Sequence, residues 1–496
     1  MRRFRTGAMA LVVVAIALGG LMPAALAKDT GGPVIVDVDR HATPDMIAAL
    51  RAAGLNVGVA YRNFPAVSGN LPQGRAAEVG GLDFVKGIRA DTIRSPSVLS
   101  GRESEGGPTV PLDSTWYLDI IDRDKTSARG DGVYVAVLDG GLTPTWRSVL
   151  DADRVRVDLG LSFTGANGNT VPYQLENDRN GHGVAVAATV IGYTLLDKSE
   201  TGQYFPEPAT GTQGEYWVPG VAPNATIIPI KVCDNGVYCW DSSIYAALDY
   251  VVDLKRGVAA DGELEGAPIV VNLSLGGPSS SVAEENIFKA VVAAGVLVVA
   301  SAGNDGPNRM GWPGAYPVVI SVGVGGWRQQ FYGSETGLNN QWTFDDVPED
   351  SIEAWFMVWW SAYEFPDRGQ ELDVVATGRF MLLPYLNGKA TPGPDPAPAD
   401  GIPSVYNYIS GTSFSAPTTT GVVALMLSVN GGLSQAQAEA ILRSTAMPIP
   451  AGSWDAGFPI PHANAWDSSK SLGGAGQQTG WGLVQADGAV AAAMDL

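Results

Sequence analysis

The sequence is poor in cysteine and in positive charge, and each shortage argues against a class of protein. Only 2 of its 496 residues are cysteine, too few for a scaffold held by several disulfides or for a structural zinc site. Residues 111–496 hold 19 Lys and Arg against 42 Asp and Glu, residues 28–110 hold nine of each, and residues 1–27 add three Arg. So acidic a body argues against a nucleic-acid partner, because binding to phosphates requires clustered Lys and Arg.

Long apolar runs are missing beyond the first 27 residues. There, three arginines precede an apolar run over about residues 8–22, and Ala25-Leu26-Ala27 follows with the small residues that a signal peptidase requires. This pattern predicts a signal peptide, residues 1–27, and therefore a secreted, extracellular protein with no stable membrane span in its mature form. A retained membrane anchor is the alternative, although the run is short for a span.

A small unit is predicted in residues 28–110. The stretch PVIVDVD indicates a strand, a helix begins at Thr43, and two further strands and a short helix follow before residue 91. This alternation predicts a compact α+β domain. Residues 92–113 are rich in Ser, Pro and Gly and read as a loop, so we place the domain boundary there.

The remaining residues, 111–496, predict a different architecture. From about residue 131, strands that are apolar on both faces alternate with helices, which is typical of an α/β fold with a doubly wound parallel sheet and helices on both faces. The helix that starts near residue 282 has a capping-box pattern, Ser281 with Glu284. Ligands of such sheets bind beyond the carboxyl ends of the strands, so the chemistry is expected there.

Three short motifs at the boundaries of buried segments bear residues of catalytic type. His182 is one of only three histidines and directly precedes a helix-like segment. Asp139 ends a buried strand, where a carboxylate orients an imidazole, although an ordinary turn is the alternative. Ser413 opens a buried helix, whose unpaired N–H groups and dipole favour an oxyanion, although a simple N-cap serine is the alternative.

Taken together in the order Asp, His, Ser, these motifs resemble the subtilisin-like serine peptidases, the subtilases, from about residue 131 to the end. Further segments resemble family motifs in the right order: Gly220–Pro223, Val271–Gly277, Ala302–Gly306, Gly311–Pro313, Tyr316–Pro317 and Gly480–Ala486. No G-x-S-x-G occurs, which disfavours an α/β-hydrolase, and His182 speaks against the sedolisin peptidases.

The resemblance implies a serine endopeptidase acting on polypeptides through an acyl-enzyme. Ser413 would be the nucleophile, His182 the base and Asp139 its orienting acid, with Asn304 in the oxyanion hole. It also implies a set of substrate-binding residues, namely Ser274, Leu275, Gly276, Ala302, Gly303 and Gly311. Their glycines predict a wide pocket that prefers large apolar or aromatic side chains before the cleaved bond.

Departures from the family pattern leave a second reading open. Gly140 replaces the usual Ser or Thr after the aspartate, and Val184-Ala185 replaces the usual Thr-His after His182-Gly183. A catalytically impaired binding protein with the subtilase fold is therefore the alternative to an active enzyme.

The resemblance also bears on residues 28–110, which resemble the family's inhibitory propeptide, and it implies a small α+β domain of ferredoxin-like type. The last residues of such a segment would lie in the substrate site until they are cut, here somewhere in 91–112. The propeptide would then act as an intramolecular inhibitor. The alternative is a lasting N-terminal binding domain.

Two expectations concern groups outside the catalytic centre. Cys233 and Cys239 flank a turn, so a disulfide is predicted outside the cell, with two unpaired thiols as the alternative. The resemblance implies that catalysis needs no cofactor. It also implies structural calcium, which the oxygen ligands of the acidic loops would suit, although no ligand set can be read from the sequence.

Two insertions are predicted within the catalytic domain, at about residues 193–219 and 325–408. The second holds eleven aromatic residues between Trp327 and Phe365. At helical spacing Trp355 and Trp359 would share a face, which favours a local core over an exposed aromatic surface.

Overall fold

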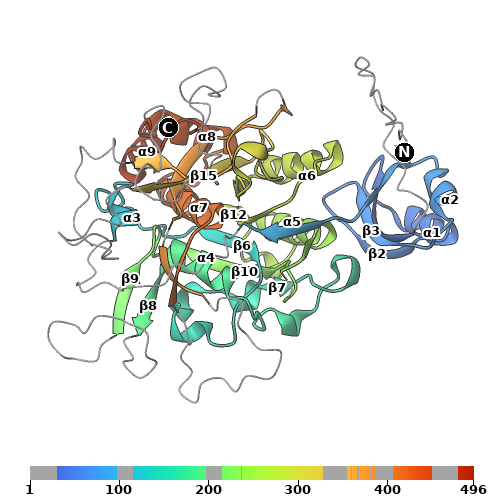
Figure 1. The fold of residues 1–496 in the computed structure, drawn as a ribbon. Coiled ribbons are helices and arrows are strands. Elements are labelled where there is room, and N and C mark those ends of the chain that lie inside the picture. Colours follow the sequence, from blue (N-terminus) through green and yellow to red (C-terminus); the bar gives the residue numbers. More distant parts are fainter. Residues whose placement is uncertain are drawn as a thin grey trace, which may run out of the picture.

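A computed structural model describes ten segments of the chain. They are residues 31–97, 115–196, 215–235, 237–327, 355–358, 360–365, 368–379, 381–385, 406–449 and 479–496. The predicted signal peptide lies outside them. Figure 1 shows a small N-terminal unit, in blue, beside a larger body, with a strand running from the unit into the body.

The N-terminal unit is a four-stranded antiparallel sheet with two helices. Its elements are β1 (Gly32–Val38), α1 (Pro44–Ala52), β2 (Asn56–Ala60), β3 (Ala66–Leu71), α2 (Ala76–Gly80) and β4 (Val85–Ala90). The strand order is β2-β3-β1-β4, which is the ferredoxin-like arrangement. The Thr43 hydroxyl accepts the Met46 N–H at 3.3 Å and so caps α1.

Both faces of this small sheet are covered. Successive side chains of a strand point to opposite faces, and in β1 Val34 and Val36 belong to the core under the two helices. Ile35 faces the other way and joins a cluster that contains Tyr245 of the body. The N-terminal unit therefore packs one sheet face on its own helices and the other on the body.

The body is built on a mainly parallel sheet. Its strands are β6 (Tyr134–Asp139), β7 (Leu161–Ser162), β10 (Thr226–Lys231), β12 (Ile269–Leu273), β14 (Val296–Ser301), β15 (Ile320–Trp327), β16 (Trp355–Met357) and β17 (Val374–Thr377). The order is β16-β15-β14-β12-β6-β10-β7, with β17 also paired to β15. Only β16 pairs antiparallel among these strands. The order reverses between β6 and β12, so their carboxyl ends flank the switch point where such sheets bind ligands.

Helices cover both faces of the sheet, as the sequence predicts. The helices of the body are α3 (Trp116–Asp119), α4 (His182–Ile191), α5 (Asp241–Lys255), α6 (Val282–Ala293), α7 (Thr412–Val429), α8 (Gln435–Thr445) and α9 (Ala486–Met494). In β6, Val135 and Val137 join the core under α4 and α7. Ala136 and Leu138 join the core under α5 and α6. The doubly wound α/β prediction is confirmed.

Further strands of the described segments lie outside this sheet. They are β5 (Ile93–Pro96), β8 (Gly192–Leu196), β9 (Glu215–Pro219), β11 (Cys239–Trp240), β13 (Leu275–Gly276), β18 (Met381–Pro384) and β19 (Tyr406–Ile409), the last two paired antiparallel. The pair β8 and β9 borders the first predicted insertion. No helix of the described segments is long and apolar enough to cross a membrane.

The aromatic insertion is partly described, and its helical reading is wrong. Trp355 lies in β16, which pairs antiparallel with the edge strand β15, so a distant strand rather than local periodicity decides its conformation. The core interpretation does hold for three described aromatics, since Trp355, Phe356 and Trp360 are buried. Trp359 lies outside the described residues.

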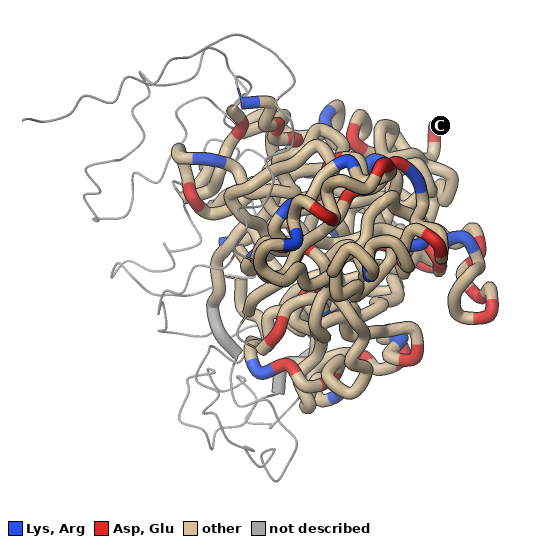
Figure 2. The backbone as a smooth tube through the Cα atoms, turned by 90° about the vertical axis from the view of Figure 1, so that its right-hand side faces the viewer, with Lys and Arg blue, Asp and Glu red and all other residues tan. Residues whose placement is uncertain are grey.

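Charges of opposite sign are interspersed along the described chain. Figure 2 shows Lys and Arg positions in blue among Asp and Glu positions in red. Arg156, for example, pairs with both Asp158 and Glu263 at 2.6 Å, and Arg62 of the N-terminal unit pairs with Asp253 of α5 at 2.9 Å. In these pairs, carboxylates of the chain itself compensate the positive charges of the arginines.

Candidate active site

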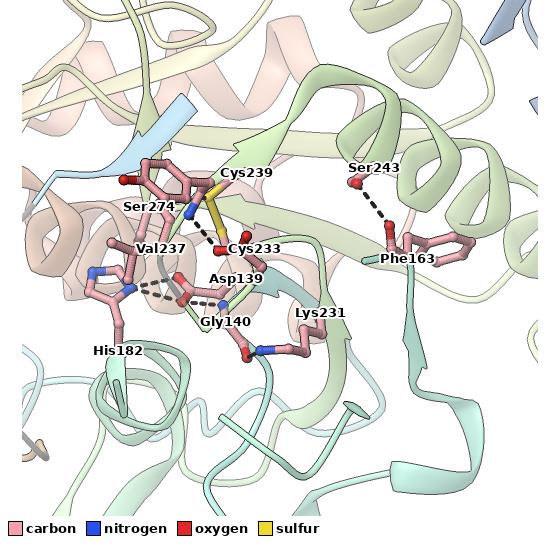
Figure 3. Close-up of a disulfide and its surroundings, with 12 residues drawn as sticks. Asp139, Gly140, Phe163, His182, Lys231, Cys233, Val237, Cys239, Ser243 and Ser274 are labelled. Atoms are coloured by element: carbon pink, nitrogen blue, oxygen red, sulfur yellow. Dashed lines mark hydrogen bonds and ion pairs between the residues drawn. A yellow bond between two sulfur atoms is a disulfide. The ribbon is translucent and has the colours of Figure 1, made fainter. Parts of the chain in front are cut away.

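Asp139 and His182 meet at the carboxyl edge of the sheet. Asp139 is the last residue of β6, and both of its carboxylate oxygens lie 2.8–2.9 Å from Nδ1 of His182, as Figure 3 shows. Both side chains are 1% exposed. Since a carboxylate only accepts, Nδ1 carries the proton and Nε2 is left with its lone pair. The imidazole is thus in the tautomer that a general base requires.

The segment before α4 places His182 against β6. The Asp178 carboxylate accepts the N–H groups of Asn180 and Gly181 at 3.1 and 2.7 Å and thereby shapes the turn. His182 is then the first residue of α4. A Cβ on Gly183 would lie 2.3 Å from the carbonyl oxygen of Gly141, so only glycine lets this helix approach the strand end closely enough.

Ser413 lies in the first turn of α7, whose residues are almost all buried. Pro417 follows four residues later and has no N–H, so the helix leaves the Ser413 carbonyl without its usual partner. The Ser274 hydroxyl donates to that carbonyl at 2.7 Å instead. The Ser-x-x-x-Pro spacing therefore ties the start of α7 to the segment that follows β12.

The second hydrogen bond expected of a triad, between His182 and Ser413, is absent from this arrangement. The Ser413 hydroxyl donates to the carbonyl oxygen of Ser274 at 2.9 Å, and Nε2 of His182, although buried, has no hydrogen-bond partner. The neighbouring ring of Phe414 lies 5.5 Å from the imidazole ring. The structure thus brings Asp139 to His182 and places Ser413 nearby, with its hydroxyl turned to Ser274.

Asn304 follows β14 and contacts the residue before Ser413. The Thr412 backbone N–H and hydroxyl both donate to the Asn304 side-chain oxygen, at 3.0 and 2.8 Å. A backbone N–H can only donate, so this atom is the amide oxygen. The NH₂ group of Asn304 is consequently held as a donor beside the start of α7.

A segment of the chain's own N-terminal part occupies the site. β5 lies between β11 and β13 and is antiparallel to both. Just after β5, the Ser97 carbonyl oxygen accepts the backbone N–H of Ser413 at 3.3 Å, while the Ser97 N–H donates to Ser274 at 3.3 Å. Sequence reading assigned these residues to a loop. An extended conformation here depends on two partner strands that lie far away in the sequence.

The predicted substrate-binding residues lie together around this segment. Leu275 pairs with Pro96 and Gly276 with Ser95. Gly311 donates its N–H to the Ala302 carbonyl at 2.7 Å, and a Cβ on Gly303 would lie 3.1 Å from the Gly311 nitrogen. The glycines therefore allow backbone segments to pack closely, in addition to any space that they leave for a side chain.

Two charged residues beside the centre escaped the sequence analysis. Lys231 ends β10 fully buried, donates to the Gly140 carbonyl, and lies 4.0 Å from Asp178; Figure 3 shows its side chain beneath Gly140. Burial lowers the pKa of Lys231 and raises the pKa of Asp178, each opposed by the other's charge. A Cβ on Gly140 would lie 3.1 Å from the Asp178 carboxylate. The only signal in the sequence was a lysine ending an otherwise apolar strand.

Cys233 and Cys239 form a disulfide next to the strand that ends in Asp139 (Figure 3). The Asp139 carbonyl accepts the N–H of Val232 at 2.8 Å and that of Cys233 at 3.1 Å. Cys239 begins β11, the strand that flanks β5. The disulfide loop therefore connects the end of β6 to one edge of the site that β5 occupies.

One group of three carboxylates converges among the described residues, formed by Glu371, Asp373 and Glu439. The Arg443 guanidinium contacts all three. Because a cation of the chain already compensates these charges, the group is an ion-pair network. Calcium binding stays a prediction without assigned ligands.

The fold and the site define a class of protein: a serine hydrolase with Asp, His and Ser at the carboxyl edge of a doubly wound α/β sheet. A model of the subtilase family matches residues 130–482. The chain therefore belongs to the subtilase family and is a serine-type endopeptidase.

Individual relatives agree with this assignment. Subtilisin DY of Bacillus licheniformis is 29% identical over 346 residues, which cover 68% of this chain and 92% of that protein. An intracellular serine protease of Paenibacillus polymyxa is 29% identical over 311 residues, covering 60% of this chain and 67% of that protein.

Among solved structures, fervidolysin from Fervidobacterium pennivorans, described as a keratinolytic enzyme related to subtilisin, is similar in fold, with a TM-score of 0.61 and 21% sequence identity. The match covers 93% of this chain and 61% of the fervidolysin chain.

Proposed function

We propose that this protein is a secreted serine endopeptidase that is inhibited by its own N-terminal unit and cuts itself between Ser97 and Val98. The observation that carries the proposal is the Ser97 carbonyl, which accepts the Ser413 N–H at 3.3 Å. A carbonyl beside the nucleophile and bound by an oxyanion-hole donor is in the position of the group to be attacked. The predicted window for this cleavage, 91–112, contains the bond.

The chemistry follows from the groups at the site. Ser413 rotates its hydroxyl from the Ser274 carbonyl toward Nε2 of His182, which removes the proton as the oxygen attacks the Ser97 carbonyl carbon. The Ser413 N–H and the Asn304 amide bind the oxyanion. His182 then donates the proton to the nitrogen of Val98, the peptide bond breaks, and water hydrolyses the acyl-enzyme by the reverse proton path. No cofactor takes part.

The N-terminal unit is held on one face of α5. The Asp249 carboxylate accepts the backbone N–H groups of Arg62 and Asn63 at 2.9 and 2.7 Å. One turn earlier, the Tyr245 hydroxyl accepts from Arg89 at 3.2 Å. Helical residues four apart share a face, so the unit is bound along the helix while β5 occupies the site. Because the unit is attached at two places, we expect it to stay bound and to inhibit the enzyme after the chain is cut.

The cleavage site and the reactive serine test the proposal directly. The full chain is expressed and its products are identified by mass spectrometry, with a fluorophosphonate added to mark activated serines. We expect a body that begins at Val98 and a label on Ser413. A first residue elsewhere would overturn the assignment of the cleaved bond, and an unlabelled, uncut chain would overturn the enzymatic proposal itself.

A binding protein with impaired catalysis is the second candidate. It is favoured by one observation, the Ser413 hydroxyl bonded to Ser274 while Nε2 of His182 has no partner. That protein would keep residues 31–97 bound and would not react with the fluorophosphonate. The labelling experiment therefore separates the two candidates.

Replacing Asn304 tests the oxyanion hole. With Asn304→Ala, the oxyanion keeps the Ser413 N–H but loses the amide donor that Thr412 holds in place. We expect kcat to fall about 10²–10³-fold, the loss given by the corresponding change in subtilisin, with little change in KM. Steady-state kinetics on a peptide substrate provide the measurement. Asn308→Ala, in the exposed turn that follows, is the matched control, and equal losses in both variants would contradict the assigned role.

Retention of the cut N-terminal unit is expected to depend on pH through Asp91. Its carboxylate accepts the Ser242 N–H at 2.9 Å. Its pKa is raised from 3.8 to about 6, chiefly because of burial; the Ser242 bonds and Arg89 oppose this rise and the charge of Asp241 adds to it. The bound state thus holds a proton more tightly than the free state, so binding strengthens as pH falls through 6 toward 4. Between pH 7 and pH 5 the dissociation constant should fall about tenfold.

Gel filtration of the cleaved complex at the two pH values measures this retention. The Asp91→Asn variant keeps an oxygen for Ser242 but cannot titrate, so the tenfold difference should vanish in it. A pH dependence that survives unchanged in Asp91→Asn would assign the effect to another group.

Three parts of the proposal rest on the sequence. Secretion rests on residues 1–27, and structural calcium on the acidic loops. The preference for large apolar side chains before the cleaved bond is also still a prediction. The chain's own segment carries Ser97 there, whose hydroxyl accepts from Ser301 at 3.3 Å. So small a side chain offers little binding energy, and recognition of this bond must depend on other positions.

A further inference from the structure

Arg94, three residues before Ser97, is the most completely enclosed side chain of the segment that occupies the site. It is 2% exposed although it is an arginine. Its Nε donates to Asp241 at 2.8 Å, and its Nη2 donates to both oxygens of Glu284 at 2.9 Å. We call this surrounding the Arg94 site. Arginine is almost never so buried unless its charge is paired.

All five N–H donors of the guanidinium are accounted for. Besides the bonds to Asp241 and Glu284, Nη1 donates to the carbonyl oxygens of Ser279 and Trp312 at 2.8 and 3.1 Å. A planar fork with five donors matches this arrangement, whereas an ammonium group has only three donors and a different geometry. The Arg94 site is therefore specific for the shape of a guanidinium as well as for its charge.

The acceptors of the Arg94 site belong to the body. Asp241 is the first residue of α5 and Glu284 lies in the first turn of α6, where helix dipoles favour negative charge. Glu284 is also held by the Tyr316 hydroxyl at 2.7 Å. The predicted capping box is only half formed. Ser281 does accept the Glu284 N–H, but its own N–H donates to Tyr316, and the Glu284 carboxylate turns to Arg94.

Once residues 31–97 leave, the carboxylates of Asp241 and Glu284 remain on the body without the guanidinium that compensates them. An uncharged side chain placed there would leave them desolvated and without a counter-charge, which is costly. Arginine compensates both. In β5, Arg94 pairs with Cys239 and Pro96 with Leu275, so an extended substrate in the same register brings its fourth residue before the cleaved bond to this site.

We propose that the mature enzyme selects polypeptide substrates with arginine at the fourth position before the cleaved bond, through Asp241 and Glu284. This rests on the proposed endopeptidase function and on a substrate lying as β5 does. Arginine is preferred over lysine, and lysine over neutral side chains.

A matched pair of internally quenched peptides tests the proposal. One carries the chain's own sequence Ile-Arg-Ser-Pro-Ser-Val-Leu-Ser-Gly, and the other has citrulline, which keeps the shape of arginine but not its charge. The full chain is expressed, allowed to process itself and separated from the cut N-terminal unit, and a sample is titrated with a fluorophosphonate so that rates refer to active enzyme. We expect kcat/KM to be about 100-fold lower for the citrulline peptide.

A variant assigns the effect to the Arg94 site. In Glu284→Gln, the values of kcat/KM for the arginine and citrulline peptides should approach each other. Glu285→Gln is the matched control, because Glu285 is the next residue of α6 and pairs with Lys289 at 2.8 Å. It should keep the full preference. If Glu284→Gln fails to fold, the two peptides on the parent enzyme still decide the question.

The possible outcomes separate this inference from the proposed function. Equal cleavage of both peptides by an enzyme that reacts with the fluorophosphonate overturns the arginine preference and leaves the endopeptidase function standing. A chain that neither reacts with the fluorophosphonate nor cleaves either peptide overturns the proposed function. A preference that persists in Glu284→Gln and in Asp241→Asn places its cause outside the Arg94 site.

Discussion

The Ser413→Ala chain is expected to remain uncut between Ser97 and Val98 and to hydrolyse peptides about 10⁶-fold more slowly than the parent, the loss that removal of the nucleophile causes in subtilisin. The nucleophilic oxygen is lost, while the other contacts stay. The Ser413 N–H still reaches the Ser97 carbonyl, and the Ser274 hydroxyl still donates to the Ser413 carbonyl. The variant should therefore fold and keep its N-terminal unit.

The measurement pairs intact mass with peptide hydrolysis, on parent and variant purified in the same way. Ser415→Ala is the matched control, because its hydroxyl donates to the Thr412 carbonyl at 3.0 Å in the same buried turn and faces no reacting group. We expect this control to process itself. A Ser413→Ala chain that still cuts itself during refolding from the purified, unfolded state would refute Ser413 as the nucleophile.

The second large effect is expected for Asp139→Asn, with a loss in kcat of about 10⁴-fold. The Asp139 carboxylate accepts the Gly140 N–H at 2.6 Å and the His182 Nδ1–H at 2.8 Å. The side chain of asparagine has only one oxygen, and we expect that oxygen to accept the Gly140 N–H. The NH₂ group then faces His182 and forces the proton from Nδ1 to Nε2. An imidazole in that tautomer cannot accept the proton of Ser413.

The comparison with Asp178→Asn separates the tautomer from the general field of a nearby charge. Asp178 is a second buried carboxylate beside the centre, but it contacts Lys231 and the turn before His182 rather than the imidazole. We expect its loss in kcat to stay within about tenfold. Equal losses in the two variants, at equal thermal stability, would show that the charge matters and the tautomer does not.

Much of the fold was predictable because its signals are local. Alternating apolar strands and helices in residues 131–496 imply a sheet covered on both sides, and the core confirms this in β6, where neighbouring side chains enter different clusters. Thr43 before Pro44 marks the start of α1. Local patterns also failed where a distant partner intervened. Trp355 was read as helical but adds to β15.

In the candidate site, too, some features could be predicted from the sequence and others could not. Asp139, His182 and Ser413 each stand at the end or the start of a buried element, so a single sequence could single them out. The side-chain rotamer that turns the Ser413 hydroxyl to Ser274 could not be read from it. Neither could Lys231 and Asp178, whose importance depends on their burial beside Asp139.

The sequence by itself therefore determined the class of fold, the residues able to perform the chemistry and the existence of an N-terminal unit, because periodicity, caps and chain order are properties of neighbouring residues. Tertiary structure alone decided what occupies the site. Arg94 bonds to carboxylates 147 and 190 residues away in the chain, and β5 is extended only because β11 and β13 lie on either side of it. Contacts across such separations form only when the sheet brings its strand ends together, and no local pattern records them.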